Sequence, residues 1–158
     1  MRICIVYDSR RGSTARVAEV IGRALKEEGA EVSVKSVNED IEVENCDLVI
    51  IGAPIYYERP LPGIVKFVEA KNGLEGKKVA VFILCIADRF GRLGKGYTER
   101  RYVGLMLRGL KTEPIGVRVF DGWIFGENEK TLKEAGEWAK RLMTALKRGE
   151  KLGIEHPG

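Results

Sequence analysis

The sequence contains no glutamine, little asparagine and a single histidine. The histidine, His156, lies close to the C-terminus, which argues against a histidine acid–base catalyst. Charged residues make up 32% of the 158 residues. Many charges and few thermolabile amides are common in proteins from hot environments. The composition therefore predicts a thermophilic source.

Long hydrophobic runs are also missing. The longest one, residues 79–87, has nine residues and is too short to cross a bilayer. The N-terminus lacks the pattern of a secretory signal peptide. The three cysteines, Cys4, Cys46 and Cys85, are far apart and form no Cys-x-x-Cys motif. We expect them to be reduced thiols in the core of a cytoplasmic protein.

The length of the chain allows one domain with a substantial core. Apolar runs and alternating stretches predict strands, and helical apolar spacing predicts the helices between and after them. We expect strands at residues 3–6, 31–37, 46–53, 77–86 and 115–124, and helices at residues 15–28, 60–70, 97–110 and 127–147. We assign residues 1–148 to the domain and expect residues 149–158 to be a loose tail.

Strands that alternate with helices of this length favour an α/β fold with a doubly wound parallel sheet of five strands and helices on both faces. Ligands of such sheets bind beyond the C-terminal ends of the strands. Three predicted loops lie at this edge, residues 9–14, 54–59 and 87–97. No G-x-G-x-x-G follows a strand, and neither a P-loop motif nor the acidic cluster of a receiver domain is present. These patterns argue against a Rossmann dinucleotide site, a P-loop nucleotide site and a receiver.

The first loop reads Tyr7-Asp8-Ser9-Arg10-Arg11-Gly12-Ser13-Thr14 and joins a buried strand to a helix. The helix N-terminus offers unpaired N–H groups and a partial positive charge. The glycine lets the backbone close around a ligand, the hydroxyls can donate hydrogen bonds, and the two arginines add positive charge. The loop predicts a phosphate cradle. An ordinary strand–helix turn with a Ser or Thr N-cap is the alternative.

These loops resemble those of the flavodoxin superfamily, and the similarity extends over nearly the whole chain. Flavodoxins wrap the phosphate of FMN with a Ser/Thr-x-Thr-Gly-x-Thr loop; Ser9, Gly12 and Thr14 match it, and Arg11 replaces the usual threonine. The resemblance implies the strand order 2-1-3-4-5 and an FMN-binding domain at residues 1–148. The cofactor-binding residues that it implies are Ser9, Arg10, Arg11, Gly12, Ser13 and Thr14 in the first loop, and Pro54, Ile55, Tyr56, Tyr57, Ile86, Ala87, Asp88, Phe90 and Gly91 in the two later loops, which would enclose the flavin ring.

One branch, the bacterial menaquinone-linked protoporphyrinogen dehydrogenases, is more similar still. Its members have a basic residue before the cradle glycine, a Gly-Ala-x-Ile-x-Tyr second loop and a basic third loop, and residues 52–57 read GAPIYY here. Two features differ. The long basic insertion after the fifth strand is missing, and Glu58 stands where many flavodoxins have a glycine whose peptide flips towards the reduced flavin. Because glutamate resists a positive φ, we do not expect this flip.

Residues 88–111 carry seven basic and two acidic side chains, a local net charge of +5 in a chain whose total is +4. Such a segment suits an acidic redox partner protein, a quinone- or porphyrin-type substrate with carboxylates, or peripheral contact with an anionic membrane. No nucleic-acid-binding module accompanies it, so we do not expect nucleic acid as a partner. The basic residues are Arg89, Arg92, Lys95, Arg100, Arg101, Arg108 and Lys111.

The sequence thus predicts an FMN-binding redox protein that carries electrons between partners. Two alternatives stay open: an FMN-dependent dehydrogenase or reductase resembling the protoporphyrinogen enzyme, and a flavin-free anion-binding module of the same fold. No side chain is indicated as an acid–base catalyst, as expected if the flavin carries the reaction. The roles of Cys85 and Trp123 and the oligomeric state also stay open.

Overall fold

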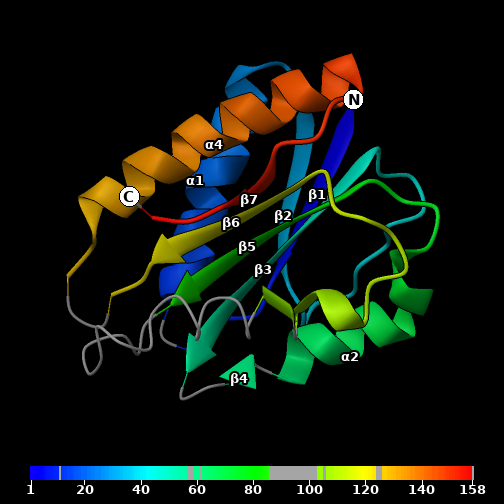
Figure 1. Ribbon diagram of the computed structural model, residues 1–158, viewed down its shortest axis with the longest axis horizontal. Coiled ribbons are helices and arrows are strands. Elements are labelled where there is room, and N and C mark those ends of the chain that lie inside the picture. The colour runs from blue at the N-terminus through cyan, green and yellow to red at the C-terminus, as the bar shows by residue number, and fades with distance from the viewer. Residues whose placement is uncertain are drawn as a thin grey trace.

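The computed structural model describes residues 1–10, 12–56, 59–60, 62–85, 103–104, 106–123 and 126–157. Within these residues seven strands form one sheet, and helices cover both of its faces (Figure 1). The elements in chain order are β1 (Arg2–Tyr7), α1 (Ser13–Glu27), β2 (Glu31–Ser36), β3 (Leu48–Tyr56), β4 (Arg59–Pro60), α2 (Pro62–Ala70), a short 3₁₀ helix (Asn72–Leu74), β5 (Val79–Cys85), β6 (Gly116–Asp121), α4 (Glu129–Arg148) and β7 (Gly153–Glu155).

The strands are ordered β2-β1-β3-β5-β6-β7, and β4 pairs with the end of β3. All neighbours in the main order are parallel, whereas β4 runs antiparallel to β3. The five predicted strands correspond to β1, β2, β3, β5 and β6, so their order is 2-1-3-4-5 as expected. The predicted doubly wound α/β fold is confirmed, and β4 and β7 are additions to it.

The core is divided into two layers by the sheet. Helices α1 and α4 pack on one face (Figure 1). In this layer Trp138 and Phe120 are fully buried, and their rings meet edge to face with centroids 6.0 Å apart. Helix α2 covers the other face together with Val103 and Met106. Strands β3 and β5 lie in the middle and are apolar on both faces, as is typical of central parallel strands. Among the described residues, no helix combines the length and apolar character needed to cross a membrane.

Gly52 of β3 is required by close packing beneath the carboxyl edge of the sheet. A Cβ atom at this position would lie 2.0 Å from the ring of Phe82 on β5. Any side chain at residue 52 would therefore force the two strands or the phenylalanine to move. The N–H of Asp8 also donates to the carbonyl of Gly52 over 3.0 Å, so the start of the first loop is fixed to this strand.

Residues 149–157 do not form the loose tail that we expected. Gly153–Glu155 form β7, which pairs in parallel with β6 at the edge of the sheet. The buried guanidinium of Arg118 donates to the carbonyl of His156 over 2.8 Å. A strand of three residues has no detectable alternation, which is why apolar patterning missed it.

The second loop is also shorter than expected. The prediction places residues 54–59 in a loop, but β3 continues to Tyr56 and forms a small antiparallel pair with Arg59–Pro60. Pairing with β5 as far as Ile55 extends the strand past the Gly52-Ala53-Pro54 motif. The pairing of β3 with β1 ends at Gly52, so at Pro54 the strand has lost this neighbour and the proline is tolerated as at a sheet edge.

Cys4 and Cys46 form a disulfide, so the prediction of reduced thiols is wrong for this pair; Cys85 is a thiol outside it. The two residues are 42 positions apart in sequence, which hides the pairing from local patterns. Cys4 lies in β1, and Cys46 lies two residues before β3, the parallel neighbour of β1. The approach to β3 therefore brings the two Cα atoms to 6.1 Å.

Candidate functional site

The first loop leaves β1 at the carboxyl edge of the sheet and enters α1 almost at once. Gly12 is the last residue before the helix and has a left-handed backbone, with φ 90° and ψ −11°. Its N–H donates to the hydroxyl of Ser9 over 3.0 Å, and its carbonyl accepts from the N–H of Arg16 over 3.0 Å. A residue with a Cβ resists this conformation, so the glycine lets the chain turn directly into the helix.

Within the described part of the chain, no side chain caps the N-terminus of α1. The Ser or Thr cap that we considered as the alternative to a phosphate cradle is therefore absent. By contrast, α4 begins with an Asn128 side chain that accepts a hydrogen bond from the N–H of Thr131 over 3.2 Å. The first N–H groups of α1 remain available to an anion, and the helix dipole favours negative charge at this point.

The hydroxyls of Ser13 and Thr14 are the most informative atoms of the loop. Both side chains are buried, with 3% and 0% exposure. Among the described residues neither hydroxyl has a hydrogen-bond partner. Buried polar groups in native proteins are nearly always paired, and an unpaired one costs about 1–3 kcal/mol. Two orphaned donors in the first turn of an uncapped helix fit the oxygens of a phosphate group.

Ser9 and Arg10 complete the described part of the cradle. The oxygen of Ser9 already accepts the N–H of Gly12, which leaves its hydroxyl hydrogen to donate to a ligand. Arg10 is exposed at the mouth of the loop. Arg11, which the prediction also included, lies outside the described residues.

Arg16 and Asp8 border the loop, but their side chains contact other parts of the protein. The guanidinium of Arg16 contacts Glu127 over 2.8 Å and Glu19 over 3.4 Å, and these bonds raise the pKa of Arg16. Asp8 lies against the first turn of α2, where a Cβ on Gly63 would come within 2.5 Å of its carboxylate. Local patterning missed both contacts, because they join segments that are far apart in sequence.

Tyr7, at the end of β1, has a raised pKa. Burial of the phenol is the main cause, and the negative charges of Glu39 and Glu19 add to it. The residue packs against the core layer of α1 and α4 and stays neutral at ordinary pH. Sequence reasoning did not single it out, since a tyrosine at the end of a strand is unremarkable.

The structure places part of the predicted ring site at the same edge. Pro54 is buried and stands opposite Leu84 of β5, and Ile55 is 1% exposed in the core layer of α2. Tyr56 is the last residue of β3. The other predicted ring residues, Tyr57, Ile86, Ala87, Asp88, Phe90 and Gly91, lie outside the described residues.

Cys85 and Trp123, whose roles the sequence does not decide, lie near the carboxyl ends of β5 and β6, respectively. Cys85 ends β5 beside Asp121 of β6 and is half-buried at the carboxyl edge. Trp123 packs against the core layer of α1 and α4. Of the basic segment, the described Arg108 is exposed, and Lys111 donates to the side chain of Asn72 over 2.9 Å.

A doubly wound sheet with an anion cradle after its first strand defines a class of proteins that bind phosphorylated cofactors at the carboxyl edge. A model of the flavodoxin domain family matches residues 4–148. This match covers most of the chain, so the chain belongs to the flavodoxin domain family. Flavodoxin homologues bind FMN, so family membership indicates FMN as the cofactor. The unpartnered hydroxyls of Ser13 and Thr14 fit a phosphate group such as the one FMN carries.

Two curated relatives illustrate the similarity in sequence. A flavodoxin from Clostridium saccharobutylicum is 33% identical over 88 residues, which cover 52% of this chain and 54% of the relative. A coenzyme F420H(2) oxidase from Methanothermobacter marburgensis is 29% identical over 80 residues, which cover 47% of this chain but only 20% of the oxidase. The chain thus spans about half of the one relative and a fifth of the other.

Solved structures show the same fold. A flavodoxin from the domain Archaea superposes with a TM-score of 0.64 and 22% identity, with 93% of this chain and 99% of that one covered. The two-electron reduced flavodoxin of Megasphaera elsdenii has a TM-score of 0.58 and 25% identity, with coverage of 88% and 98%. The rubredoxin oxygen:oxidoreductase of Desulfovibrio gigas matches 93% of this chain with 36% of its own length, at a TM-score of 0.64 and 19% identity.

Proposed function

We propose that this protein is an FMN-dependent electron carrier that exchanges electrons with a partner protein. The observation that carries the proposal is the pair of buried, unpartnered hydroxyls of Ser13 and Thr14 at the uncapped N-terminus of α1. The flavodoxins among the relatives support it, since they match nearly full-length in structure.

The bound FMN would supply the electron chemistry, and the protein would hold and shield it. Ser9, Ser13 and Thr14 would donate hydroxyl hydrogens to the phosphate, and the first N–H groups of α1 would add further donors. Each hydrogen bond to the charged phosphate contributes about 1.5–3 kcal/mol. Gly12 keeps the backbone close enough for these bonds. The second and third loops, residues 54–59 and 87–97, would enclose the ring.

The domain bounds and the basic segment also belong to this proposal. We assign the FMN-binding domain to residues 1–148, and we propose that the basic segment 88–111 faces an acidic redox partner. A cytoplasmic location and a thermophilic source belong to the same proposal. The Cys4–Cys46 disulfide is compatible with both, because intracellular proteins of hyperthermophiles are often rich in disulfides.

An FMN-dependent dehydrogenase or reductase is the alternative. It is supported by the GAPIYY motif and by the basic segment, which would bind the carboxylates of a porphyrin-type substrate or a quinone. The F420H(2) oxidases and the rubredoxin oxygen:oxidoreductase contain a similar domain as a fraction of a larger enzyme.

Reconstitution tests the proposal. The apoprotein is loaded with FMN and placed between a flavoprotein NADPH reductase and cytochrome c. A carrier accelerates cytochrome c reduction in proportion to bound FMN, and the apoprotein does not. Turnover of protoporphyrinogen with a quinone acceptor, without a second protein, would instead establish the dehydrogenase. If FMN does not bind or raise the melting temperature, the flavin-free module is correct.

A further inference from the structure

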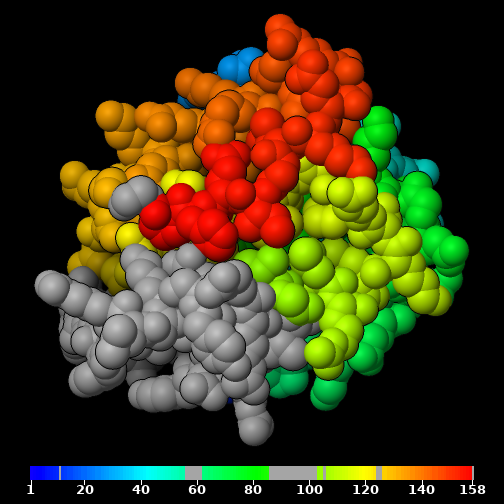
Figure 2. Space-filling view, viewed as in Figure 1, coloured from blue at the N-terminus to red at the C-terminus, as the bar shows by residue number. Residues whose placement is uncertain are grey.

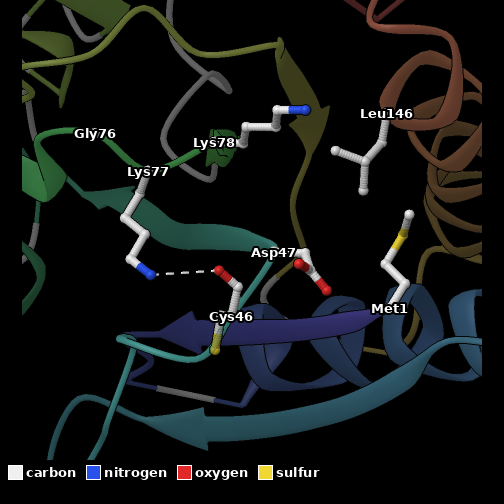
Figure 3. A pocket seen from close by; sticks show the side chains of 7 residues that line it. All are labelled: Met1, Cys46, Asp47, Gly76, Lys77, Lys78 and Leu146. Carbon is white, nitrogen blue, oxygen red and sulfur yellow. Dashed lines mark hydrogen bonds between the residues drawn. The ribbon is translucent and has the colours of Figure 1, made fainter.

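The Cys4–Cys46 disulfide lies at the amino edge of the sheet, opposite the cradle. Cys4 is the third residue of β1, whereas the cradle follows the last residue of β1. In Figure 3 the sulfur of Cys46 points towards β1 and its carbonyl points towards Lys77. The bridge therefore connects the segment before β3 to β1, at a distance from any flavin bound at the carboxyl edge.

Residues 37–47 form the connection between β2 and β3, and few interactions hold its centre. Ile41 and Val43 are buried, with 7% and 4% exposure, and Cys46 donates its N–H to the carbonyl of Val43 over 3.1 Å. Between these residues Glu42, Glu44 and Asn45 are exposed. The disulfide is a covalent cross-link between this segment and β1.

Lys77 provides a second attachment of the same segment. Its ammonium group donates to the carbonyl of Glu44 over 2.5 Å. It also donates to the carbonyl of Cys46 over 3.5 Å (Figure 3). Lys77, Cys46, Asp47 and Met1 line a cavity of about 580 Å³ that opens at this edge. Solvent in this cavity reaches the backbone of Cys46. The positive charge of Lys77 attracts the anionic thiolate of a reductant.

We propose that the Cys4–Cys46 disulfide is a thiol–disulfide exchange site for a dithiol reductant, and that its reduction releases the centre of the connection, residues 41–46, from β1. A thiolate of the dithiol attacks the sulfur of Cys46, the Cys46–Cys4 bond breaks, and Cys4 leaves as a thiolate that takes up a proton. The second thiol of the reductant then displaces Cys46 and forms the reductant's own disulfide. Two electrons and two protons pass from the dithiol to the protein.

Burial makes this exchange depend on local opening. Cys4 is 6% exposed and Cys46 is 7% exposed. A dithiol therefore reaches the bridge only when the connection between β2 and β3 moves away from the cavity. Once the bridge is reduced, Lys77 and the buried side chains of Ile41 and Val43 still hold the centre of the segment. Its two ends stay bonded to β1 through the N–H groups of Val37 and Asp47. The reduced form therefore opens more often than the oxidised form, while the cradle at the other edge remains folded.

Limited proteolysis of the FMN-loaded protein tests this inference. A glutamate-specific protease is added to protein equilibrated with oxidised glutathione, and to the same protein after dithiothreitol. We expect cleavage after Glu42 and Glu44 to accelerate by about tenfold on reduction, with bound FMN unchanged. Alkylation of the unfolded oxidised chain should modify Cys85 alone, and that of the reduced chain all three cysteines.

Two variants separate the bridge from general effects of reductant. Cys85→Ala should keep the tenfold response. The double variant Cys4→Ala/Cys46→Ala should lose it and be cleaved at the reduced rate under both conditions. Equal cleavage of the oxidised and reduced wild-type protein would overturn the proposal, as would three alkylated cysteines after oxidation or a redox response that persists in the double variant.

Discussion

At the residue scale, Ser13 and Thr14 carry buried hydroxyls that find no hydrogen-bond partner among the residues that the structure describes. This arrangement has two opposite consequences. Without ligand the orphaned hydroxyls destabilise the fold, and with ligand they bind a charged phosphate at close range. Removal of a hydroxyl should therefore change apoprotein stability and FMN affinity in opposite directions, which a merely structural hydroxyl would not do.

Thr14→Val and Ser13→Ala test this prediction. Each change should weaken FMN binding by about 10- to 100-fold, since a charge-assisted hydrogen bond contributes about 1.5–3 kcal/mol. The melting temperature of each apoprotein should stay equal or rise. Riboflavin, which lacks the phosphate, should keep its affinity in calorimetric titration. Thr144→Val, on an exposed turn of α4, is the matched control and should alter neither ligand. An equal loss for riboflavin and FMN would contradict this role.

Gly12 holds the loop in its left-handed turn, with open space where a Cβ would lie. Gly12→Ala should destabilise the apoprotein by about 1 kcal/mol through backbone strain alone. Gly104→Ala is the control, because Gly104 is helical and also has open space around it. That change should stabilise the protein by about 0.5–1 kcal/mol. Chemical denaturation measures both, and equal effects of the two changes would show that the turn is unstrained.

Tyr7 gives a pH-dependent prediction. Its pKa is raised above the ordinary value of 10.0 by burial and by Glu39 and Glu19. A raised folded pKa means that its contribution to stability is complete below pH 10.0 and is lost as the pH rises through the folded value. An ultraviolet difference titration of wild type against Tyr7→Phe should show a tyrosine that ionises above 10.0. Ionisation of this residue at or below its ordinary pKa would refute the burial argument.

The residues of the cradle could be predicted because their signal is local. A buried strand, a glycine and several hydroxyls next to a helix all fall within residues 3–14. The contacts of Asp8 with Gly63 and of Arg16 with Glu127 could not be predicted, since they depend on how α1, α2 and the start of α4 meet in space.

At the element scale, β7 shows how an element without a sequence pattern can still be fixed. It pairs with β6, and its Glu155 accepts a hydrogen bond from Arg141 of α4 over 2.6 Å. The guanidinium of Arg118 lies 5.1 Å from the ring centroid of Phe120 and binds both Glu134 and the carbonyl of His156. The last residues thus cover a buried positive charge at the sheet edge.

Deletion of residues 150–158 tests this function of β7. We expect a loss of about 2 kcal/mol, because the buried Arg118 loses a hydrogen-bond acceptor, and a fall in melting temperature of about 4–8 °C. Glu155→Gln removes only the partly exposed ion pair with Arg141 and should cost less than about 1 kcal/mol. Unchanged thermal unfolding of the deletion variant would restore the interpretation of this segment as a loose tail.

The long elements were predictable and the short ones were not. The strands β1, β3 and β5 are continuous apolar runs, and α4 has a regular apolar face, so their type followed from periodicity. Strands β4 and β7 have two and three residues. Their pairing is decided by neighbours that the chain places beside them, and such pairing leaves no period in the sequence.

At the scale of the whole molecule, we expect the disulfide to raise the melting temperature. The bridge closes a loop across 42 positions, which removes chain entropy from the unfolded state. The loop-entropy model gives about 4 kcal/mol for a loop of this length. The sequence contains many charges and no glutamine, which is consistent with the thermophilic source that we propose.

Thermal unfolding with and without reductant tests this prediction. Reduction should lower the melting temperature by about 8–16 °C, the shift that about 4 kcal/mol gives in a domain of this size. The Cys4→Ala/Cys46→Ala variant should melt near the reduced wild-type protein and should not respond to reductant. Cys85→Ala should keep the full difference. A difference below about 2 °C would show that the bridge adds little to stability.

The flavodoxin family follows from the strand order, the cradle and the family match together, and none of these depends on the partner. The family match names no partner, and most of the basic segment that we propose as the partner surface lies outside the described residues. For that reason the fold and the cofactor could be predicted from the sequence, whereas the choice between carrier and dehydrogenase depends on the experiments with a partner protein or a substrate.

The most direct test of the account is a crystal structure of the protein with bound FMN. We predict that the phosphate lies at the N-terminus of α1 and accepts hydrogen bonds from the hydroxyls of both Ser13 and Thr14. The account would be contradicted by a phosphate bound elsewhere on the protein, or by a bound FMN that leaves these two hydroxyls unpaired.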